Sequence, residues 1–142
     1  MDGITCKFVR PDRQLFEGEV ASVVLVTPTG ELGVWPLHDP EIISLGYGVV
    51  RLNLLERDGG GTVKVIVSGG YAEVGPDHVI LLADHACRAD RIEEDVVRET
   101  RAQAEHNLAL LDEEDSRRAY YESKIHWFDT LLGNAIADVI EE

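Results

Sequence analysis

The distribution of proline and glycine divides this chain into two parts that must fold differently. All five prolines and all but one of the 13 glycines lie before residue 88, and only Gly133 follows it. Proline and glycine interrupt helices and favour turns. The first part is therefore expected to hold strands joined by turns, and the second to hold helices. We place the domains at residues 1–87 and 88–142.

Residues 1–87 show repeated strand patterns. The run at residues 20–26 is densely β-branched and predicts a strand buried on both faces. Elsewhere apolar and polar residues alternate, as in strands with one buried face, and turn residues separate the runs. These runs are residues 4–9, 49–55 and 62–67, with a further hairpin of residues 71–74 and 78–82. Short strands at close spacing predict an all-β sandwich or barrel.

Residues 88–142 carry two apolar stripes with the period of one face of an α-helix. The first stripe is Ile92, Val96, Thr100, Ala104, Leu108 and Leu111, and the second is Tyr121, Ile125, Phe128, Leu132, Ala135 and Val139. Two helices with a short link predict an antiparallel hairpin. Two roles stay open for the bulky residues of the second helix, packing inside the hairpin or docking onto a partner: Tyr121, Ile125, Trp127, Phe128 and Leu132.

Acidic residues mark both expected helix starts. Asp90, with Glu93 three residues later, has the spacing of a pair that caps the first helix. The run of residues 112–115, Asp-Glu-Glu-Asp, is expected to begin the second helix, because carboxylates stabilise the positive end of a helix dipole.

The charge and hydropathy of the chain exclude several classes of protein. A net charge of −14 argues against a protein that binds nucleic acid or adsorbs to anionic lipid. No run of roughly 18 apolar residues predicts a membrane-spanning helix. The first residues lack the basic and apolar regions of a signal peptide. We therefore expect a cytosolic protein without membrane insertion, able to dock onto a membrane complex.

No motif for chemistry is found. The sequence has no G-x-S-x-G, no P-loop and no Cys-x-x-Cys, and its five histidines form neither H-x-H nor H-E-x-x-H. Cys6 and Cys87 are expected to be reduced and buried as small apolar groups. We predict no catalytic residue, no metal ligand set and no cofactor; a small hydrolase or metal enzyme is the least supported reading.

The stretch of residues 29–38, Thr-Gly-Glu-Leu-Gly-Val-Trp-Pro-Leu-His, is expected to be an irregular loop of the kind that carries contacts. It resembles the GELG-x-x-P-x-H turn of the epsilon subunit of the F-type ATP synthase. Residues 67–74 (VSGGYAEV) and 81–84 (LLAD) match the same family, as do residues 15–20 (LFEGEV) and 48–52 (GVVRL).

The resemblance implies an α+β fold, an N-terminal antiparallel β-sandwich followed by a C-terminal antiparallel two-helix hairpin. It implies a non-catalytic rotor subunit of the central stalk, peripheral on the cytoplasmic side of the cell membrane. Its partners would be the gamma subunit and the ring of c subunits, with the alpha/beta catalytic head as a further partner of a regulatory hairpin. A stand-alone interaction module on the same fold is the alternative.

Carried onto this sequence, the resemblance places Thr29, Gly30, Glu31 and His38 at the c-ring interface. Some family members bind ATP through an I/L-D-x-x-R-A motif at the start of the first helix. Here Val96 stands where that motif has arginine, so no nucleotide site is expected. After Lys124 the chain carries only acidic charge, which argues against strong inhibition of ATP hydrolysis by the tail.

Overall fold

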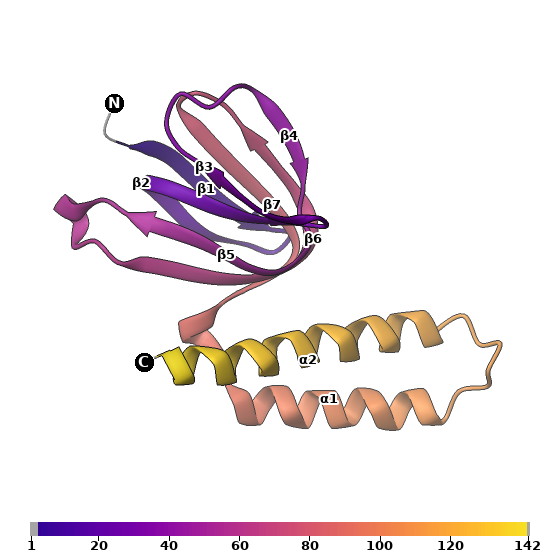
Figure 1. Ribbon diagram of the computed structural model, residues 1–142. Helices are drawn as coiled ribbons and strands as arrows, with labels where there is room; N and C mark the ends of the chain where they lie inside the picture. The colour runs from indigo at the N-terminus through magenta and orange to yellow at the C-terminus, as the bar shows by residue number, and fades with distance from the viewer. Residues whose placement is uncertain (1–2, 142) are drawn as a thin grey trace. The chain divides into compact units, whose positions relative to one another are not determined.

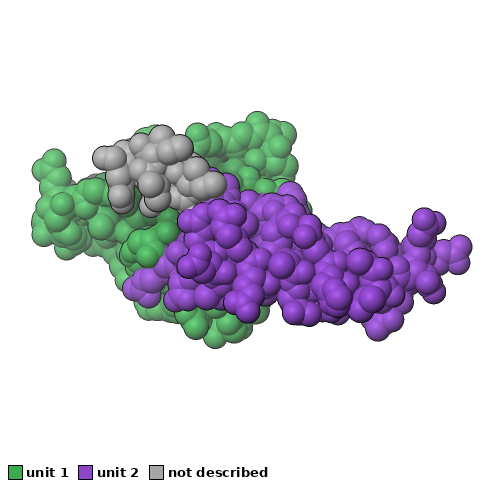
Figure 2. All heavy atoms as spheres, turned by 90° about the horizontal axis from the view of Figure 1, so that it is seen from below, with its two compact units in different colours: residues 1–90 green, residues 91–142 purple. Residues whose placement is uncertain are grey.

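The computed structural model describes the backbone of residues 3–141 and the side chains up to residue 134. It divides into two compact units, residues 1–90 and 91–142, which are coloured separately in Figure 2. The first unit contains the strands (Figure 1): β1 (Ile4–Arg10), β2 (Arg13–Thr27), β3 (Gly30–Val34), β4 (Glu41–Ser44), β5 (Tyr47–Leu54), β6 (Thr62–Val74) and β7 (His78–Arg88). Short 3-10 turns, η1 (Glu56–Asp58) and η2 (Ala89–Arg91), follow β5 and β7, and the second unit contains α1 (Glu94–Ala109) and α2 (Arg118–Glu141).

The strands pair in the order β1-β7-β6-β5-β2-β3, with β4 beside β6, and β1 also pairs with β2. The path β1-β7-β6-β5-β2 therefore returns to β1, so these five strands form a closed ring in which each strand is paired on both sides. Every pairing is antiparallel except that of β1 with β7, which is parallel. The predicted sandwich followed by a helical hairpin is confirmed. The parallel pair was not foreseen, because alternation shows which face is buried and not which strand lies alongside.

The longest departure from the expected strands is β6, one strand where two were predicted. It pairs with β5 as far as Ser68 and with β4 from Tyr71, while β7 stays beside it. Gly69 and Gly70 lie at the change of partner, with φ of +75° and +124°. A Cβ on Gly70 would lie 2.2 Å from the carbonyl oxygen of Leu82. Glycine thus bends a strand here without ending it.

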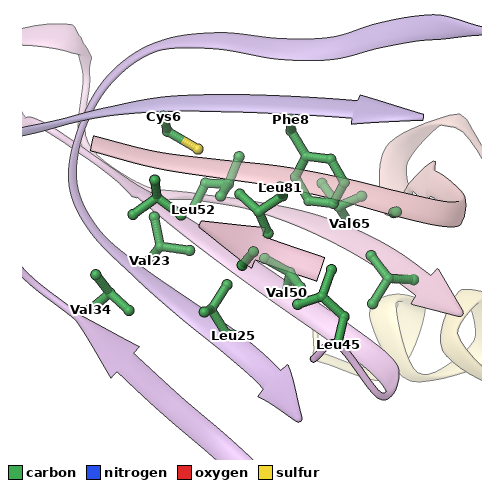
Figure 3. Close-up of a cluster of buried hydrophobic side chains, with 14 of the residues drawn as sticks. Cys6, Phe8, Val23, Leu25, Val34, Leu45, Val50, Leu52, Val65 and Leu81 are labelled. Atoms are coloured by element: carbon green, nitrogen blue, oxygen red, sulfur yellow. The ribbon is translucent and has the colours of Figure 1, made fainter. Parts of the chain in front are cut away.

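The core of the first unit fills the space between the strands with apolar side chains (Figure 3). In β1 every second residue is fully buried, namely Ile4, Cys6 and Phe8. Burial raises the pKa of the Cys6 thiol to about 12, so the group stays protonated and packs as a small apolar side chain. Both cysteines are free; Cys6 is buried as predicted, whereas Cys87 is only half-buried.

The prediction that residues 20–26 are buried on both faces is wrong. The pairing of β2 with β5 shifts register between Val20 and Ser22. Beyond this bulge Val23 and Leu25 are fully buried, whereas Val24 and Val26 are only half-buried. One extra residue in the strand therefore restores an alternation that the run of apolar residues concealed.

The two helices of the second unit form the predicted hairpin, joined by an ion pair between Arg101 and Asp129. Among its side chains described, up to residue 134, the buried ones are Ala104 of α1 and Leu131 of α2. The first predicted stripe is partly wrong, because Val96 is 53% exposed and Thr100 is exposed, with its hydroxyl donating to the Val96 carbonyl. The predicted stripe residues 135 and 139 lie outside the described side chains. Neither helix is both long and apolar enough to cross a membrane over the residues described.

Both predicted helix starts are wrong. Asp90 lies in η2, where its carboxylate accepts hydrogen bonds from Arg88, and Glu93 occupies the cap position of α1 without a side-chain bond. Residues 112–115 form the turn before α2. Asp115 accepts from the backbone N–H and the guanidinium of Arg117, and these bonds lower its pKa to about 2. An arginine two residues away offers this carboxylate stronger donors than a helix terminus does.

Candidate partner-binding surfaces

The first half of the 29–38 stretch is a regular hairpin, so its assignment to an irregular loop is wrong. Thr27 of β2 lies opposite Gly30 of β3, and Pro28 and Thr29 form a two-residue turn. The Thr27 hydroxyl donates to the Gly30 carbonyl at 2.7 Å and accepts from the Thr29 N–H at 3.3 Å. Gly30, at φ +135°, adopts a backbone conformation that other residues rarely reach. Of the two glycines in this stretch, Gly30 serves the turn and Gly33 lies within β3, opposite Val24.

This turn rests on a fixed backbone platform. The Gly46 N–H donates to the Val26 carbonyl at 2.9 Å, and the Gly69 N–H donates to the Gly46 carbonyl at 3.0 Å. A Cβ on Gly46 would lie 2.8 Å from the Thr27 carbonyl oxygen, so the backbone segments at Gly46 and Thr27 approach as closely as glycine allows. The backbone of the turn is held in place, while the Thr29 side chain is exposed to solvent.

Glu31 follows the turn and is exposed on the outer face of β3. Its carboxylate forms an ion pair with Arg51 of β5, which reaches it across β2. The side chains are 53% and 41% exposed, so water screens the pair and its net contribution is about 0–1 kcal/mol. A basic group on a partner can therefore compete with Arg51 for this carboxylate at little cost.

The second half of the stretch crosses to β4 at the opposite end of β3. Trp35 is 59% exposed and its ring covers Gly33, where a Cβ would lie 2.3 Å from a ring carbon. Leu37 has φ of +71°, and its N–H donates to the Pro76 carbonyl at 2.7 Å. His38 is half-buried, with Nδ1 2.7 Å from the Asp39 carbonyl oxygen.

The four residues expected at one interface thus fall into two places. Thr29, Gly30 and Glu31 lie together at the start of β3, and His38 lies beyond its other end. A strand of five residues spans roughly 13–17 Å, so no single small contact covers both places.

Sequence reasoning missed an exposed apolar face on β4, β6 and β7. Ile42, Tyr71 and Leu82 are 75%, 60% and 53% exposed. Tyr71 lies directly opposite Leu82 and is paired on its other side with Ser44, two residues from Ile42. The sequence signal for this face was the presence of large apolar residues at strand positions where the alternation predicts an exposed side chain. We name these three residues the outer apolar face.

The bulky residues predicted for α2 are half-buried: Tyr121, Ile125, Trp127, Phe128 and Leu132. Tyr121 makes an edge-to-face contact with Tyr120, whose ring centroid lies 5.2 Å away, and Tyr120 is itself 58% exposed. The ammonium of Lys124 lies 5.0 Å from the centroid of the Tyr120 ring. Tyr120, which the stripe left out, is therefore the exposed aromatic residue of α2.

Comparisons with known proteins place this arrangement in a family. The sequence model described as "ATP synthase, Delta/Epsilon chain, beta-sandwich domain" matches residues 3–89. A protein of Moorella thermoacetica named ATP synthase epsilon chain is 40% identical over 108 residues, which are 76% of this chain and 78% of that one. One of Dichelobacter nodosus with the same name is 42% identical over 106 residues, 75% and 72% of the two chains. The chain belongs to the ATP synthase epsilon-chain family.

A solved structure supports the fold of this epsilon chain. A chain in the cryo-EM structure of Euglena gracilis mitochondrial ATP synthase, OSCP/F1/c-ring, superposes with a TM-score of 0.68 at 23% identity, over 92% of this chain and 80% of that one. The epsilon chain is a non-catalytic subunit, so the turn at Thr29 and the outer apolar face are candidate surfaces for binding.

A cluster of charged groups lies at the turn between β6 and β7 of this epsilon chain. His78 Nδ1 lies 2.9 Å from Asp77 Oδ1, and His78 Nε2 lies 3.3 Å from Glu73 Oε2. The hydrogen bond to Asp77 raises the pKa of His78, Glu73 adds to the rise, and the same bond to His78 lowers the pKa of Asp77. The two carboxylates therefore favour the imidazolium.

We expect this cluster to make stability fall slightly as pH rises above the unfolded pKa of His78, about 6.5. Because the pKa of His78 is higher in the folded than in the unfolded chain, its contribution is complete below the unfolded pKa of about 6.5 and is lost as pH rises through the folded pKa. NMR titration of the His78 ring protons measures this pKa. In Asp77→Asn the pKa of His78 should fall toward its ordinary value. The decrease in the urea unfolding midpoint between low and high pH should then be smaller than in the unaltered chain. An equal pKa in both proteins contradicts the prediction.

Proposed function

We propose that this epsilon chain is a rotor subunit of the ATP synthase central stalk that couples the gamma subunit to the c-ring. It would lie on the cytoplasmic side of the cell membrane without inserting into it. The proposal rests on family membership across the whole sandwich. It gains support from two solvent-exposed surfaces, the turn at Thr29 and the outer apolar face, carried by one seven-stranded sheet.

The c-ring contact is proposed at Thr29, Gly30 and Glu31. The turn is exposed, its backbone is fixed by the platform at Gly46, and its carboxylate is held only by a solvated ion pair with Arg51. Basic side chains on a ring loop would suit this carboxylate. His38 takes part only if the contact extends along the whole of β3.

The gamma contact is proposed at the outer apolar face. Stable subunit interfaces bury apolar and aromatic side chains at their centre. Ile42, Tyr71 and Leu82 supply such a centre on paired strands, whose ladder hydrogen bonds already hold the backbone in place. The two proposed contacts therefore use different strands and different chemistry, which makes them separable by mutation.

The test measures both contacts with the same set of variants. Leu82→Asp should weaken association with purified gamma by at least about tenfold, because it places a charge in an apolar interface. Glu31→Lys should leave gamma binding unchanged and reduce retention on detergent-solubilised c-ring by about fivefold, since only one screened ion pair is reversed. Asp58→Lys is the matched control for the charge reversal, because Asp58 lies in the exposed turn η1.

Two results would refute the proposal. Absence of a complex between the unaltered chain and gamma at micromolar concentration would favour the alternative of a stand-alone interaction module. Equal loss of ring binding in Glu31→Lys and Asp58→Lys would remove the Thr29 turn from the contact.

The hairpin would be regulatory, with the alpha/beta catalytic head as a further partner, and we propose that it holds no nucleotide. Val96, at the position where some family members have arginine, is an exposed apolar side chain and offers a phosphate no donor. Because the charges after Lys124 are all acidic, strong inhibition of ATP hydrolysis is not expected.

A further inference from the structure

The end of the hairpin nearest its turn contains a groove between the two helices. It has a volume of about 500 Å³ and is lined by Glu105, Leu108, Ala109, Arg118, Glu122 and Ile125. Leu108 and Ile125 are half-buried members of the two apolar stripes, so the groove exposes part of the seam between α1 and α2. Its volume is in the range of about 300–1,000 Å³ that ligand-binding clefts occupy.

The groove has acidic edges. Glu105 and Glu122 have side chains 53% and 58% exposed, and both are in solvated ion pairs, Glu105 with Arg101 at 2.7 Å and Glu122 with Arg118 at 3.7 Å. Arg118 also donates to the Leu111 carbonyl at 3.3 Å. From Glu105 to Glu122 the chain has six acidic and two basic residues, a net charge of −4. Three acidic residues of the adjoining turn, Asp112, Glu113 and Glu114, are exposed and have no ion pair among the residues described.

We propose that this groove docks a basic amphipathic helix of another protein. Apolar side chains of such a helix would lie against Leu108, Ala109 and Ile125, and its lysines or arginines would face Glu105, Glu122 and the acidic turn. Helices bind grooves in this way through apolar residues at positions i, i+3, i+4 and i+7. A second copy of this chain is disfavoured as occupant, because its own acidic edges would meet the same charges.

The surface is distinct from those proposed for gamma and the c-ring. It lies wholly within the second unit, and both of the others lie within the first. Its test therefore stands apart from theirs, and either can fail alone.

The test uses the full-length chain labelled for NMR and a synthetic 18-residue peptide of leucine and lysine in a helical amphipathic pattern. A peptide of the same composition in scrambled order has the same charge without an apolar face. The amphipathic peptide should bind in the micromolar range and shift the amide signals of Leu108, Ala109 and Ile125. The scrambled peptide should bind at least tenfold more weakly.

Matched variants separate the groove from general charge attraction. Glu105→Gln with Glu122→Gln should weaken binding by about fivefold, since the double variant removes two solvent-screened carboxylates from the edges of the groove. Glu56→Gln with Glu99→Gln removes the same charge outside the groove and should change binding by less than about twofold. Ala109→Trp should fill the groove and abolish binding, whereas Ala102→Trp should not.

Four results would overturn the proposal. The first is equal binding of the two peptides, the second is a set of shifts outside the groove, and the third is no shift at millimolar peptide. A dimer of the unliganded chain that protects Leu108 and Ile125 would assign the groove to a second copy and would equally refute it.

Discussion

Gly70→Ala is expected to destabilise the sandwich by about 3 kcal/mol or more. The new Cβ would lie 2.2 Å from the Leu82 carbonyl oxygen and 2.8 Å from the Ala83 Cα, both backbone atoms of the neighbouring strand. The φ of +124° adds strain, because it is essentially restricted to glycine. Relief requires β6 and β7 to separate where they pair. Since domains are stable by only about 5–15 kcal/mol, much of the variant should be unfolded under mild denaturant.

Gly60→Ala is the matched control. Gly60 also has a positive φ, +65°, but a Cβ there would meet nothing within 4 Å. This φ lies in the left-handed region, which costs a non-glycine residue roughly 1–2 kcal/mol. Urea unfolding followed by circular dichroism measures both variants. Equal midpoints for the two would show that the sheet gives way at Gly70 and that the close approach is not required.

Gly70→Ala is also expected to disturb the proposed c-ring contact. The Leu45 N–H donates to the Gly70 carbonyl at 2.9 Å, and Gly69 and Gly46 continue the chain of bonds to the Val26 carbonyl beside the turn. Two glycines in β6 therefore fix the position of a turn more than 35 residues earlier in the sequence. Folded molecules of Gly70→Ala should bind the ring less well although Glu31 is unchanged.

Local periodicity predicted the fold because it reports which face of an element is buried. In β1, Ile4, Cys6 and Phe8 alternate with exposed residues and all three are fully buried, so the pattern was sufficient. The periodicity misled where a bulge or a glycine pair changes which residues of a strand face the core. The bulge after Val20 made β2 look buried on both faces, and the pair Gly69–Gly70 made β6 look like two strands.

The candidate site was less predictable, because it depends on contacts between distant segments. The ion pair of Glu31 joins it to Arg51, 20 residues away and on the far side of β2. His38 is separated from Thr29 because β3 is a strand, whereas the glycines and the proline of residues 29–38 suggested a loop. Pairing of Tyr71 with Leu82 depends on register, which alternation alone does not set.

Phe8→Ala is the second substitution with a large expected effect. Phe8 is fully buried in the core between β1, β2 and β7, where Phe16 and Leu81 are its cross-strand partners. Truncation of a buried phenylalanine to alanine costs about 3–5 kcal/mol, through lost transfer free energy and the cavity left behind. A closed set of strands has few ways to collapse into that cavity, so we expect a value in the upper half of this range.

Val9→Ala provides the comparison within the same strand, because Val9 is only half-buried and should cost about 1 kcal/mol. Urea unfolding of both variants tests the prediction, with the NMR amide signals of the strands reporting on the sandwich and circular dichroism at 222 nm reporting on the helices. If the two compact units unfold separately, Phe8→Ala lowers the first midpoint and leaves the helical one unchanged. If both signals shift together, the hairpin depends on the sandwich for its stability.

A loss below about 1 kcal/mol for Phe8→Ala would mean that the strands around Phe8 close the cavity. That result would contradict the rigidity on which the proposed coupling role depends.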